Sequence, residues 1–498
     1  MKKNIIRTVF LLALFSLIFL NVQTVLRYKW DGDDPGENFS GRNGAYRKEP
    51  GDSVDIFCVG TSEMHQAFSP VVAYEKTGLT GYNFAMQTRS AMSEYYEVKY
   101  ALKYQKPSVV ICDFMALFDD ASVSMNDVNY RKTIDTIPSL PIKYMIARDI
   151  CRMDPGESFA DWFIPLLHYH SGWSELDETY FVTPKEKKRE YKVYTKGWNY
   201  REPGRFDGEI IEISPGLWEV EDDPLPVSEG SVYYYDKLIR ECREKDVRVA
   251  AVIPPKLGDA PVIQSHYGVF SRYFEDRGVE LLDYDVYDEV EWMGLSMTSD
   301  FADRYHLNGL GAYKFTTALA EDLKELFGLE DRRLNPGAVS SEWDENEREY
   351  RSDLFSGQNT LFDFLEYLSL YDDMPFIMGA SDLGTVRDER YGELFEALGI
   401  DVSRMSQTTP FVMRDEEGRI SYFPAPSEDN PLESAYNSEV LHFVTSPDFD
   451  PDDIEKTGLQ VMTFYPASAE VCSYSAYDKN LKNDDYYNEF EAVRKRLY

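Results

Sequence analysis

The sequence predicts an α/β protein with three parts: an N-terminal transmembrane anchor, a larger domain on a parallel sheet, and a smaller C-terminal α/β domain. Three observations predict this organisation. Residues 8–26 form an uncharged, apolar stretch, short apolar strands alternate with helices from residue 54 onward, and a second apolar pattern follows a charged stretch near residue 330. Strands and helices that alternate in this way indicate a parallel sheet with helices on both faces, which is a three-layer domain.

Residues 1–30 predict a cytoplasmic tip and a transmembrane signal anchor. The uncharged stretch approaches the ~20 residues needed to cross a bilayer, and no small-x-small cleavage site follows it. Three basic residues lie among the first seven, which favours an amino end inside the cell. We therefore expect a single-pass protein of the cell membrane. Residues 31–50 form a juxtamembrane linker, and the bulk of the chain is extracytoplasmic.

Charge and cysteine content exclude some classes of function. A net charge of −36 argues against nucleic acid as a partner, because neutralising phosphates requires clustered Lys and Arg. The five cysteines are scattered, and no CxxC or Cys/His metal spacing occurs. We therefore expect buried thiols rather than a disulfide framework, and we expect no metal and no cofactor.

The larger domain is predicted over residues 51–328. Its strands are expected at 54–59, 80–85, 107–114, 247–255 and 278–285, and its helices at 70–78, 90–105, 233–246 and 311–326. The segment 151–223 interrupts this alternation and is rich in Trp, Tyr and His. An insertion over the sheet edge, of the kind that builds a substrate lid or cleft, would explain it.

Residues 329–352 are polar and charged, which predicts a linker, and residues 353–498 have an apolar pattern of their own. We expect helices at 360–371 and 390–399 and strands at 375–381, 458–466 and 470–478, with a strand pair across 411–423. This pattern suffices for a small independent α/β domain.

Ser62 follows the first predicted strand in "GTSEMHQAFSP". It is therefore expected on the loop at the carboxyl end of that strand, the edge where open α/β sheets bind ligands. A lone Ser in such a loop more often only hydrogen-bonds a turn, and a nucleophile needs a base.

Asp303 and His306 supply a candidate base. They lie three residues apart in "SDFADRYHLNGLGAYKFT", just before the last helix of the domain. A carboxylate so placed can bind one imidazole nitrogen while the other nitrogen faces the hydroxyl of Ser62, as in a catalytic triad. The alternative is that His306 caps the helix and Asp303 satisfies a loop.

The motifs G-T-S and D-x-x-H-L-N-x-x-G resemble those of the SGNH (GDSL-like) hydrolase superfamily. The chain is most similar to its membrane-anchored branch, which includes the D-alanine transfer protein of teichoic acids and alginate O-acetyltransferases. The phrases "NFAMQTRSAMSEYYEVKYALKYQKPSVVICDF" and "PLLHYHSGWSEL" extend the resemblance over about residues 50–330. It implies an SGNH-like fold in which Ser62 is the nucleophile, His306 the base and Asp303 the residue that orients the base.

The family also implies an oxyanion hole and a substrate cleft. The candidates for the oxyanion hole are the amide of Ser62, the side chain of Asn83 and the backbone amides near Ala85 and Gln87. The candidates for substrate binding are Glu63, His65, Asp113, His168, His170 and Trp173. As alternatives, Glu63 and His65 could be solvated loop residues, and Asp113 could cap the end of its strand. The two histidines of "LLHYHSGW" could form a metal pair, but the lack of a third ligand favours cleft or packing roles.

The C-terminal region resembles the interleukin-like (epithelial–mesenchymal transition inducer) domain that is appended to surface enzymes. The similarity lies in "FLEYLSLYDDMPFIMGASD", "LFEALGID" and "GLQVMTFYPASAEVCSYSAYD". No catalytic pattern is visible there, so we expect a module that binds a glycan or a partner protein.

Together these features predict a membrane-tethered, extracytoplasmic serine esterase or O-acyltransferase that acts on a cell-surface polysaccharide or similar polymer. The resemblance implies a multi-span membrane acyl exporter as a partner and favours transfer over hydrolysis. The alternative from another class is a non-catalytic surface scaffold whose SGNH-like domain binds glycan or supports assembly without turnover.

Overall fold

The protein is described from a computed structural model. It covers residues 2–26, 38–118, 123–176, 181, 192–204, 227–257, 269–335, 337–358, 360–380, 383–424, 459–466, 470–482 and 490–493. The chain divides into two compact units, Met1–Trp343 (unit 1) and Asp344–Tyr498 (unit 2). This boundary lies within the predicted linker at 329–352.

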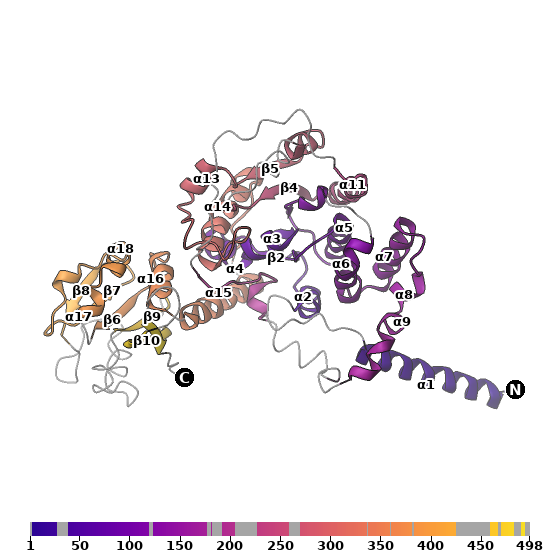
Figure 1. The fold of residues 1–498 in the computed structure, drawn as a ribbon, viewed down its shortest axis with the longest axis horizontal. Helices are drawn as coiled ribbons and strands as arrows, with labels where there is room; N and C mark the ends of the chain where they lie inside the picture. The colour runs from indigo at the N-terminus through magenta and orange to yellow at the C-terminus, as the bar shows by residue number, and fades with distance from the viewer. Residues whose placement is uncertain are drawn as a thin grey trace. The chain divides into compact units, whose positions relative to one another are not determined.

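Helix α1, Lys2–Leu26, is long and apolar enough to cross a membrane, and it is the one helix of this kind among the described residues (Figure 1). Its residues from 3 to 18 are exposed, and burial begins at Phe19 and is nearly complete at Leu26. This burial comes from contacts of α1 with helix α9, Pro165–Tyr169, and the 3₁₀ helix η3, His170–Glu175.

Unit 1 contains a five-stranded parallel sheet, as the sequence predicts. The strands are β1 Ile56–Val59, β2 Gly81–Asn83, β3 Val109–Cys112, β4 Arg248–Ile253 and β5 Glu280–Asp283. Their order is β2-β1-β3-β4-β5, and every neighbouring pair is parallel. All five carboxyl ends therefore lie at one edge of the sheet.

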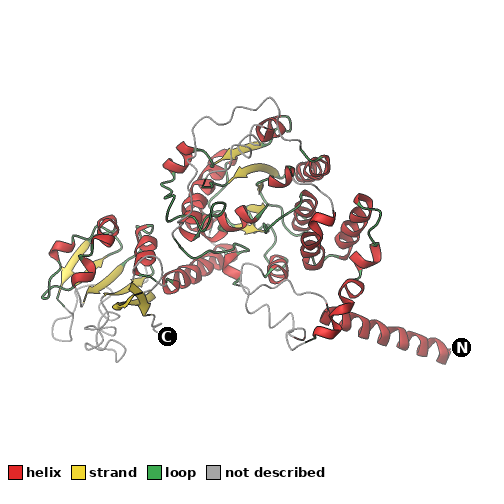
Figure 2. Cartoon of the chain, in the orientation of Figure 1, coloured by secondary structure: helices red, strands yellow, loops and turns green. Residues whose placement is uncertain are grey.

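Helices cover both faces of this sheet (Figure 2). Because successive strand residues point to opposite faces, Phe57 and Val59 pack in one core, and Ile56 and Cys58 in the other. The first core includes α5 Ala91–Ala101, α6 Val123–Thr136, α7 Leu140–Met153 and α11 Glu229–Glu244, and the second includes α3 Ser62–Ala67, α4 Pro70–Thr77 and α14 Gly309–Phe327. Shorter helices are α2 Phe39–Tyr46, η2 Met115–Leu117, α8 Phe159–Phe163, η5 Val193–Thr195, α13 Tyr287–Trp292 and η6 Arg332–Leu334.

Within the predicted insertion at 151–223, the described residues 192–204 run along the edge of the sheet. The amide of Asn83, on edge strand β2, donates to the carbonyl of Lys196 at 2.8 Å. Gly197 is required beside it, because its φ is +94° and a Cβ would lie 2.0 Å from the carbonyl oxygen of Asn83. Residues 205–223 of the insertion lie outside the described residues.

Unit 2 combines helices with a six-stranded sheet, as expected, but every pair of strands is antiparallel, so its arrangement is α+β rather than parallel α/β. The strand order is β11-β10-β9-β6-β7-β8. The strands are β6 Phe376–Ala380, β7 Phe411–Arg414, β8 Ile420–Phe423, β9 Leu459–Phe464, β10 Val471–Lys482 and β11 Phe490–Val493. The helices are α16 Leu361–Ser369, α17 Leu383–Val386, η7 Glu389–Tyr391, α18 Gly392–Ala397 and η8 Val402–Arg404.

The predicted linker is largely helical, because α15 spans Ala338–Gly357. Its charged residues suit an exposed helix surface, and Arg351 pairs with Glu347 one turn earlier at 3.0 Å. Trp343, the last residue of unit 1, is buried at the start of this helix and packs against Tyr74, with 5.3 Å between the ring centroids. The polar composition therefore marked the surface of a helix rather than an extended connection.

Candidate active site

Ser62 is the first residue of helix α3 rather than part of a loop. Thr61 ends the loop early, because its hydroxyl accepts a hydrogen bond from the amide of Glu63 at 3.3 Å and so caps the helix. The serine still follows the carboxyl end of β1 by only a few residues, at the edge where the sequence predicted it.

The loop before α14 holds Asp303 and His306 in a closed turn. The amide of Ala302 donates to the carbonyl of His306 at 2.9 Å, and Phe301 and Leu307 form an antiparallel bridge. The cap of α14 is Asn308, whose side chain accepts from the first amides of the helix. The alternative that His306 caps this helix is therefore wrong.

Ser62, His306 and Asp303 form a continuous chain of hydrogen bonds. The Nε2 atom of His306 lies 2.8 Å from the Oγ of Ser62, and its Nδ1 lies 2.8 Å from both carboxylate oxygens of Asp303. With the proton on Nδ1, the imidazole donates to the carboxylate and Nε2 accepts from the serine hydroxyl. Partial burial raises the pKa of Asp303, but its hydrogen bonds with His306 and with the amide of Tyr305 outweigh burial and hold it below the usual value.

Asp113 lies behind the nucleophile and not in a substrate cleft. It is buried at the end of β3 and accepts two hydrogen bonds of 2.7 Å from Thr61, one from the amide and one from the hydroxyl. A side chain at Gly60, whose φ is +145°, would lie 2.8 Å from the same carboxylate. Burial, with a further contribution from the nearby Glu63 carboxylate, raises the pKa of Asp113 to about 6. Asp113 therefore fixes the segment that carries Ser62, which corrects its assignment to substrate binding.

The side chain of Asn83 is turned away from an oxyanion position. Its amide nitrogen donates to the carbonyls of Met64 and Phe68, both at 2.9 Å, and its oxygen accepts from the amide of Ala85 at 2.9 Å. These bonds occupy both of its N–H groups and also the amide of Ala85. Asn83 thus ties α3 to β2, and the prediction that these two groups line an oxyanion hole is wrong.

With Asn83 and Ala85 excluded, the remaining candidates for the oxyanion hole are the backbone amides of Ser62 and Gln87. The amide of Met86 donates to the carbonyl of Gly60 at 3.2 Å, which brings the segment before Gln87 beside the nucleophile loop. The side-chain oxygen of Gln87 lies 3.5 Å from the ammonium nitrogen of Lys132. These two amides stay predictions for the oxyanion hole.

Glu63 and His65 are not solvated loop residues. Glu63 pairs with the ammonium group of Lys256 at 3.0 Å, and the side chain of Lys256 is buried. Lys256 follows β4 at the same edge of the sheet, and the next residue, Leu257, donates its amide to the carbonyl of Arg304 at 3.0 Å. The ion pair thus joins the nucleophile helix to the loop that carries His306. Sequence reasoning missed Lys256, because a single lysine after a strand forms no pattern by itself.

His168, His170 and Trp173 lie away from the hydrogen-bonded chain, whereas His65 lies on the same helix as Ser62 but is buried in the core. His65 is fully buried, with its ring 6.0 Å from that of Phe39. The Nδ1 atom of His168 lies 3.3 Å from the Asp161 carboxylate, and that of His170 lies 2.6 Å from a backbone carbonyl. Figure 1 shows α9 well separated from α3. The three residues on α9 and η3 therefore do not line the site around Ser62, and the histidine pair contacts protein acceptors.

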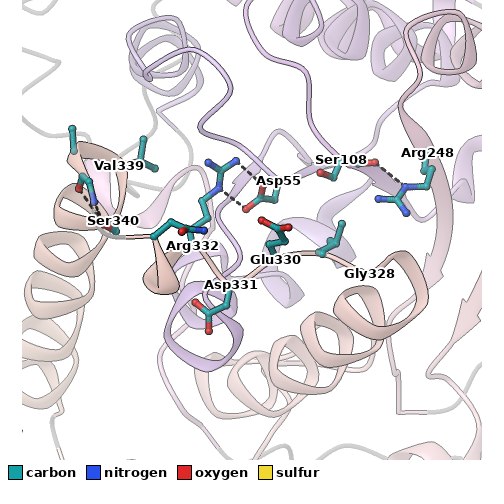
Figure 3. A pocket seen from close by; sticks show the side chains of 13 residues that line it. Asp55, Ser108, Arg248, Gly328, Glu330, Asp331, Arg332, Val339 and Ser340 are labelled. Atoms are coloured by element: carbon teal, nitrogen blue, oxygen red, sulfur yellow. Dashed lines mark hydrogen bonds and ion pairs between the residues drawn. The ribbon is translucent and has the colours of Figure 1, made fainter.

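A cavity of about 510 Å³ opens at the opposite, amino-terminal edge of the sheet (Figure 3). Asp55, Ser108 and Arg248 line it near the starts of β1, β3 and β4. Arg332 makes a two-pronged ion pair with Asp55 at 2.7 and 2.8 Å, and Arg248 donates to the carbonyl of Ser108 at 3.3 Å. The charged groups of this cavity thus stabilise the fold and contribute nothing to the triad.

Three buried groups, Glu94, Cys112 and Asp113, bring potential ligand atoms within 4.8 Å of one another. The thiol of Cys112 lies 3.2 Å from the carboxyl of Glu94. Burial raises the pKa of Glu94 to about 8, so this carboxyl keeps its proton at neutral pH. The Cys112 thiol and the Glu94 carboxyl therefore form a hydrogen-bonded pair in the core. All five cysteines are free, and four of them are buried.

The free energy of unfolding should fall as pH rises, because the Glu94 carboxyl keeps its proton in the folded protein and releases it on unfolding. The folded protein holds its proton up to about pH 8, whereas the unfolded chain releases it near 4.5, so unfolding becomes more favourable as pH rises between these values. One such proton contributes a slope of about 1.4 kcal/mol per pH unit. We expect Glu94→Gln to flatten this slope in urea unfolding at several pH values. Glu244→Gln, an exposed change on α11, controls for the lost charge, and equal slopes for all three proteins would contradict the assignment.

No family model matches this chain, and no curated protein matches it. The chemistry of this site follows from the geometry of its own residues. A serine hydroxyl within hydrogen-bond distance of an imidazole, itself oriented by a carboxylate, is chemically equipped for nucleophilic attack on a carbonyl carbon.

Proposed function

We propose that the chain is a membrane-tethered, extracytoplasmic serine esterase or O-acyltransferase of the SGNH type. The observation that supports this is the hydrogen-bond chain from Ser62 through His306 to Asp303, with two distances of 2.8 Å at the imidazole. The nucleophile and the base come from opposite ends of unit 1, 244 residues apart in the sequence. Side chains that meet by chance in a fold seldom stand in the order of nucleophile, base and orienting carboxylate that acyl transfer requires.

In the proposed reaction the Oγ of Ser62 attacks the carbonyl carbon of an ester or thioester while its proton passes to Nε2 of His306. The tetrahedral intermediate then expels the alcohol or thiol, which takes that proton from the imidazolium. An acyl ester remains on Ser62. Water or a sugar hydroxyl attacks this ester, gives its proton to Nε2, and releases the acyl group as an acid or as a new ester. The imidazolium returns this proton to the Oγ of Ser62 as that oxygen leaves. Asp303 stabilises the imidazolium throughout.

The tether is α1, with its amino end in the cytoplasm and the two units outside the cell. This placement puts Ser62 near the outer membrane surface, where a polysaccharide or a similar cell-surface polymer is the acceptor. A multi-span membrane acyl exporter is the proposed source of acyl groups. Unit 2 acts as the module that binds glycan or a partner, because no catalytic pattern is visible among its described residues.

An acyl donor tests the proposal directly. The full chain in detergent should react with 4-nitrophenyl acetate to give an acetyl group on the peptide that contains Ser62, detected by mass spectrometry. Candidate surface oligosaccharides should then accelerate loss of this acetyl group and carry it themselves if the protein is a transferase, whereas water alone should suffice for an esterase. Failure to acylate Ser62 with either ester or thioester donors would contradict both forms of the proposal.

One observation favours a second function, that of a non-catalytic glycan-binding scaffold. The side-chain amide of Asn83 is fully used inside the protein, so the site has one oxyanion donor fewer than predicted. A scaffold should bind surface oligosaccharides with the same affinity in wild type and in Ser62→Ala, and it should never become acylated. The acyl-donor experiment therefore separates the two functions.

A further inference from the structure

The side of unit 1 from which α1 projects carries an unusual set of exposed apolar side chains. In Figure 1 helices α7, α8 and α9 form a column on this side, and neighbouring helices of the column contact one another. The exposed members of the set are Leu140 and Tyr144 on α7, Leu167 on α9 and Trp173 on η3. Phe159 and Phe163 on α8 lie between them and are partly buried against the core of unit 1. We call these six residues the apolar collar.

Helix α7 has apolar side chains on two opposite faces. Ile142, Ile146 and Ile150 are buried in the core of unit 1, as expected for a helix that covers a sheet. Leu140 and Tyr144 lie one turn apart on the outer surface and are 70% and 50% exposed. The outer face of a helix that contacts only water normally carries polar side chains. The outer face of α7 is therefore suited to contact with an apolar surface.

The collar continues from α7 towards α1 through ring contacts. The ring of Tyr144 lies 5.3 Å from that of Phe159, and Phe159 stacks on Phe163 at 5.5 Å. Leu167 and Trp173 then follow on the two short helices that touch the carboxyl-terminal part of α1. Trp173 is 57% exposed although it lies beside the helix that we assign to the membrane.

We propose that the apolar collar lies in the outer lipid–water interface, so that unit 1 rests on the membrane through α7, α8, α9 and η3. The inference depends on the proposed membrane insertion of α1. If the uncharged stretch 8–26 of α1 spans the bilayer, its packed part from Phe19 to Leu26 lies towards the outer end of the span, so α9 and η3, which contact α1, lie at the outer interface. Trp and Tyr are the residues that proteins place at this level.

Charge favours a neutral lipid surface as the occupant. The six collar side chains are uncharged, and the exposed basic groups of α7, Arg148 and Arg152, both pair with Asp149, so apolar contact rather than attraction to anionic headgroups is the proposed driving force. Aromatic and aliphatic side chains of the collar enter the boundary between headgroups and acyl chains without such attraction. Contact at this surface also restricts rotation of unit 1 about α1 and thereby fixes the direction in which Ser62 faces.

Fluorescence quenching tests the collar. The full chain is reconstituted into phosphatidylcholine vesicles with and without brominated acyl chains, which quench tryptophans that reach the lipid. The matched control is Trp292 on α13, which is 60% exposed on a part of unit 1 remote from α1 in Figure 1. We expect brominated lipid to quench wild type and Trp292→Phe alike and Trp173→Phe distinctly less. The difference between wild-type and Trp173→Phe spectra should also be blue-shifted.

Flotation of the vesicles separates failure of the collar from failure of the anchor. A chain that does not float with vesicles contradicts membrane insertion of α1 and the collar with it. A chain that floats, but whose quenching is the same in wild type and Trp173→Phe, overturns the collar alone and leaves a protein partner as the occupant of this face. Reaction of Ser62 with an acyl donor is independent of both results, so the enzyme proposal is judged separately.

Discussion

Ser62→Ala should abolish covalent reaction of the protein with a fluorophosphonate probe and reduce hydrolysis of 4-nitrophenyl acetate to the level of buffer. The hydroxyl of Ser62 is the one group that contacts Nε2 of His306 in the described structure, and alanine removes it without adding bulk. For a well-studied serine protease, loss of the nucleophile lowers kcat on the order of 10⁶-fold. We expect loss beyond detection with either reagent.

Ser299→Ala is the matched control for this substitution. Ser299 lies on the loop that carries Asp303 and His306, and its hydroxyl bonds only weakly to its neighbour Asp300, at 3.5 Å. This variant should keep the probe reaction within about twofold of wild type. Circular dichroism and thermal unfolding should be unchanged for both variants, because neither side chain fills a core. Equal labelling of wild type and Ser62→Ala would show that another nucleophile reacts and would contradict the proposed mechanism.

The parts of this protein that the sequence predicted well are those fixed by local patterns. A buried parallel strand needs a short apolar run, so β3 at Val109–Cys112 falls inside the predicted strand 107–114. The helix closed by Gly78 begins at Pro70 as predicted, since proline suits the first turn and glycine adopts the left-handed cap at φ +74°. These features depend on neighbouring residues and not on the rest of the chain.

The candidate triad was predictable for a different reason. Ser62 and His306 are 244 residues apart, and no local pattern links them, so the prediction used the resemblance of two motifs to one family. The directions of side chains were not predictable. Asn83 bonds back to α3 because the carbonyls of Met64 and Phe68 both lie within reach, a fact of tertiary packing that its own strand does not encode.

Long-range packing also explains the error at "LLHYHSGW". Aromatic and histidine residues in an insertion are equally suited to a substrate cleft and to a membrane interface, and the choice depends on which element they touch. Here α9 and η3 contact α1, which places Trp173 beside the long apolar helix. Lys256 shows the converse case, because one lysine after a strand has no pattern until the fold brings it to Glu63.

Asp303→Asn should lower the rate of acylation sharply while the protein stays folded. The carboxylate accepts from Nδ1 of His306 and from the amide of Tyr305, and the amide side chain of asparagine can keep only part of this pattern. It can also hold the imidazole in the tautomer whose Nε2 carries the proton and cannot accept from Ser62. For the equivalent change in a well-studied serine protease the loss in kcat is on the order of 10⁴-fold. Half-exposure of Asp303 admits water as a substitute acceptor, so we expect a loss of at least about 10²-fold.

His306→Ala should cost at least as much as Asp303→Asn, because it removes the base itself. Adding Asp303→Asn to His306→Ala should then change little, since a carboxylate that acts only through the imidazole has nothing left to orient. The measurement is the second-order rate of fluorophosphonate labelling for the two single variants and the double variant, across a range of pH. If both single variants retain wild-type rates while Ser62→Ala is inactive, the base is another group, and the hydrogen bond of 2.8 Å between His306 and Ser62 has no role in catalysis.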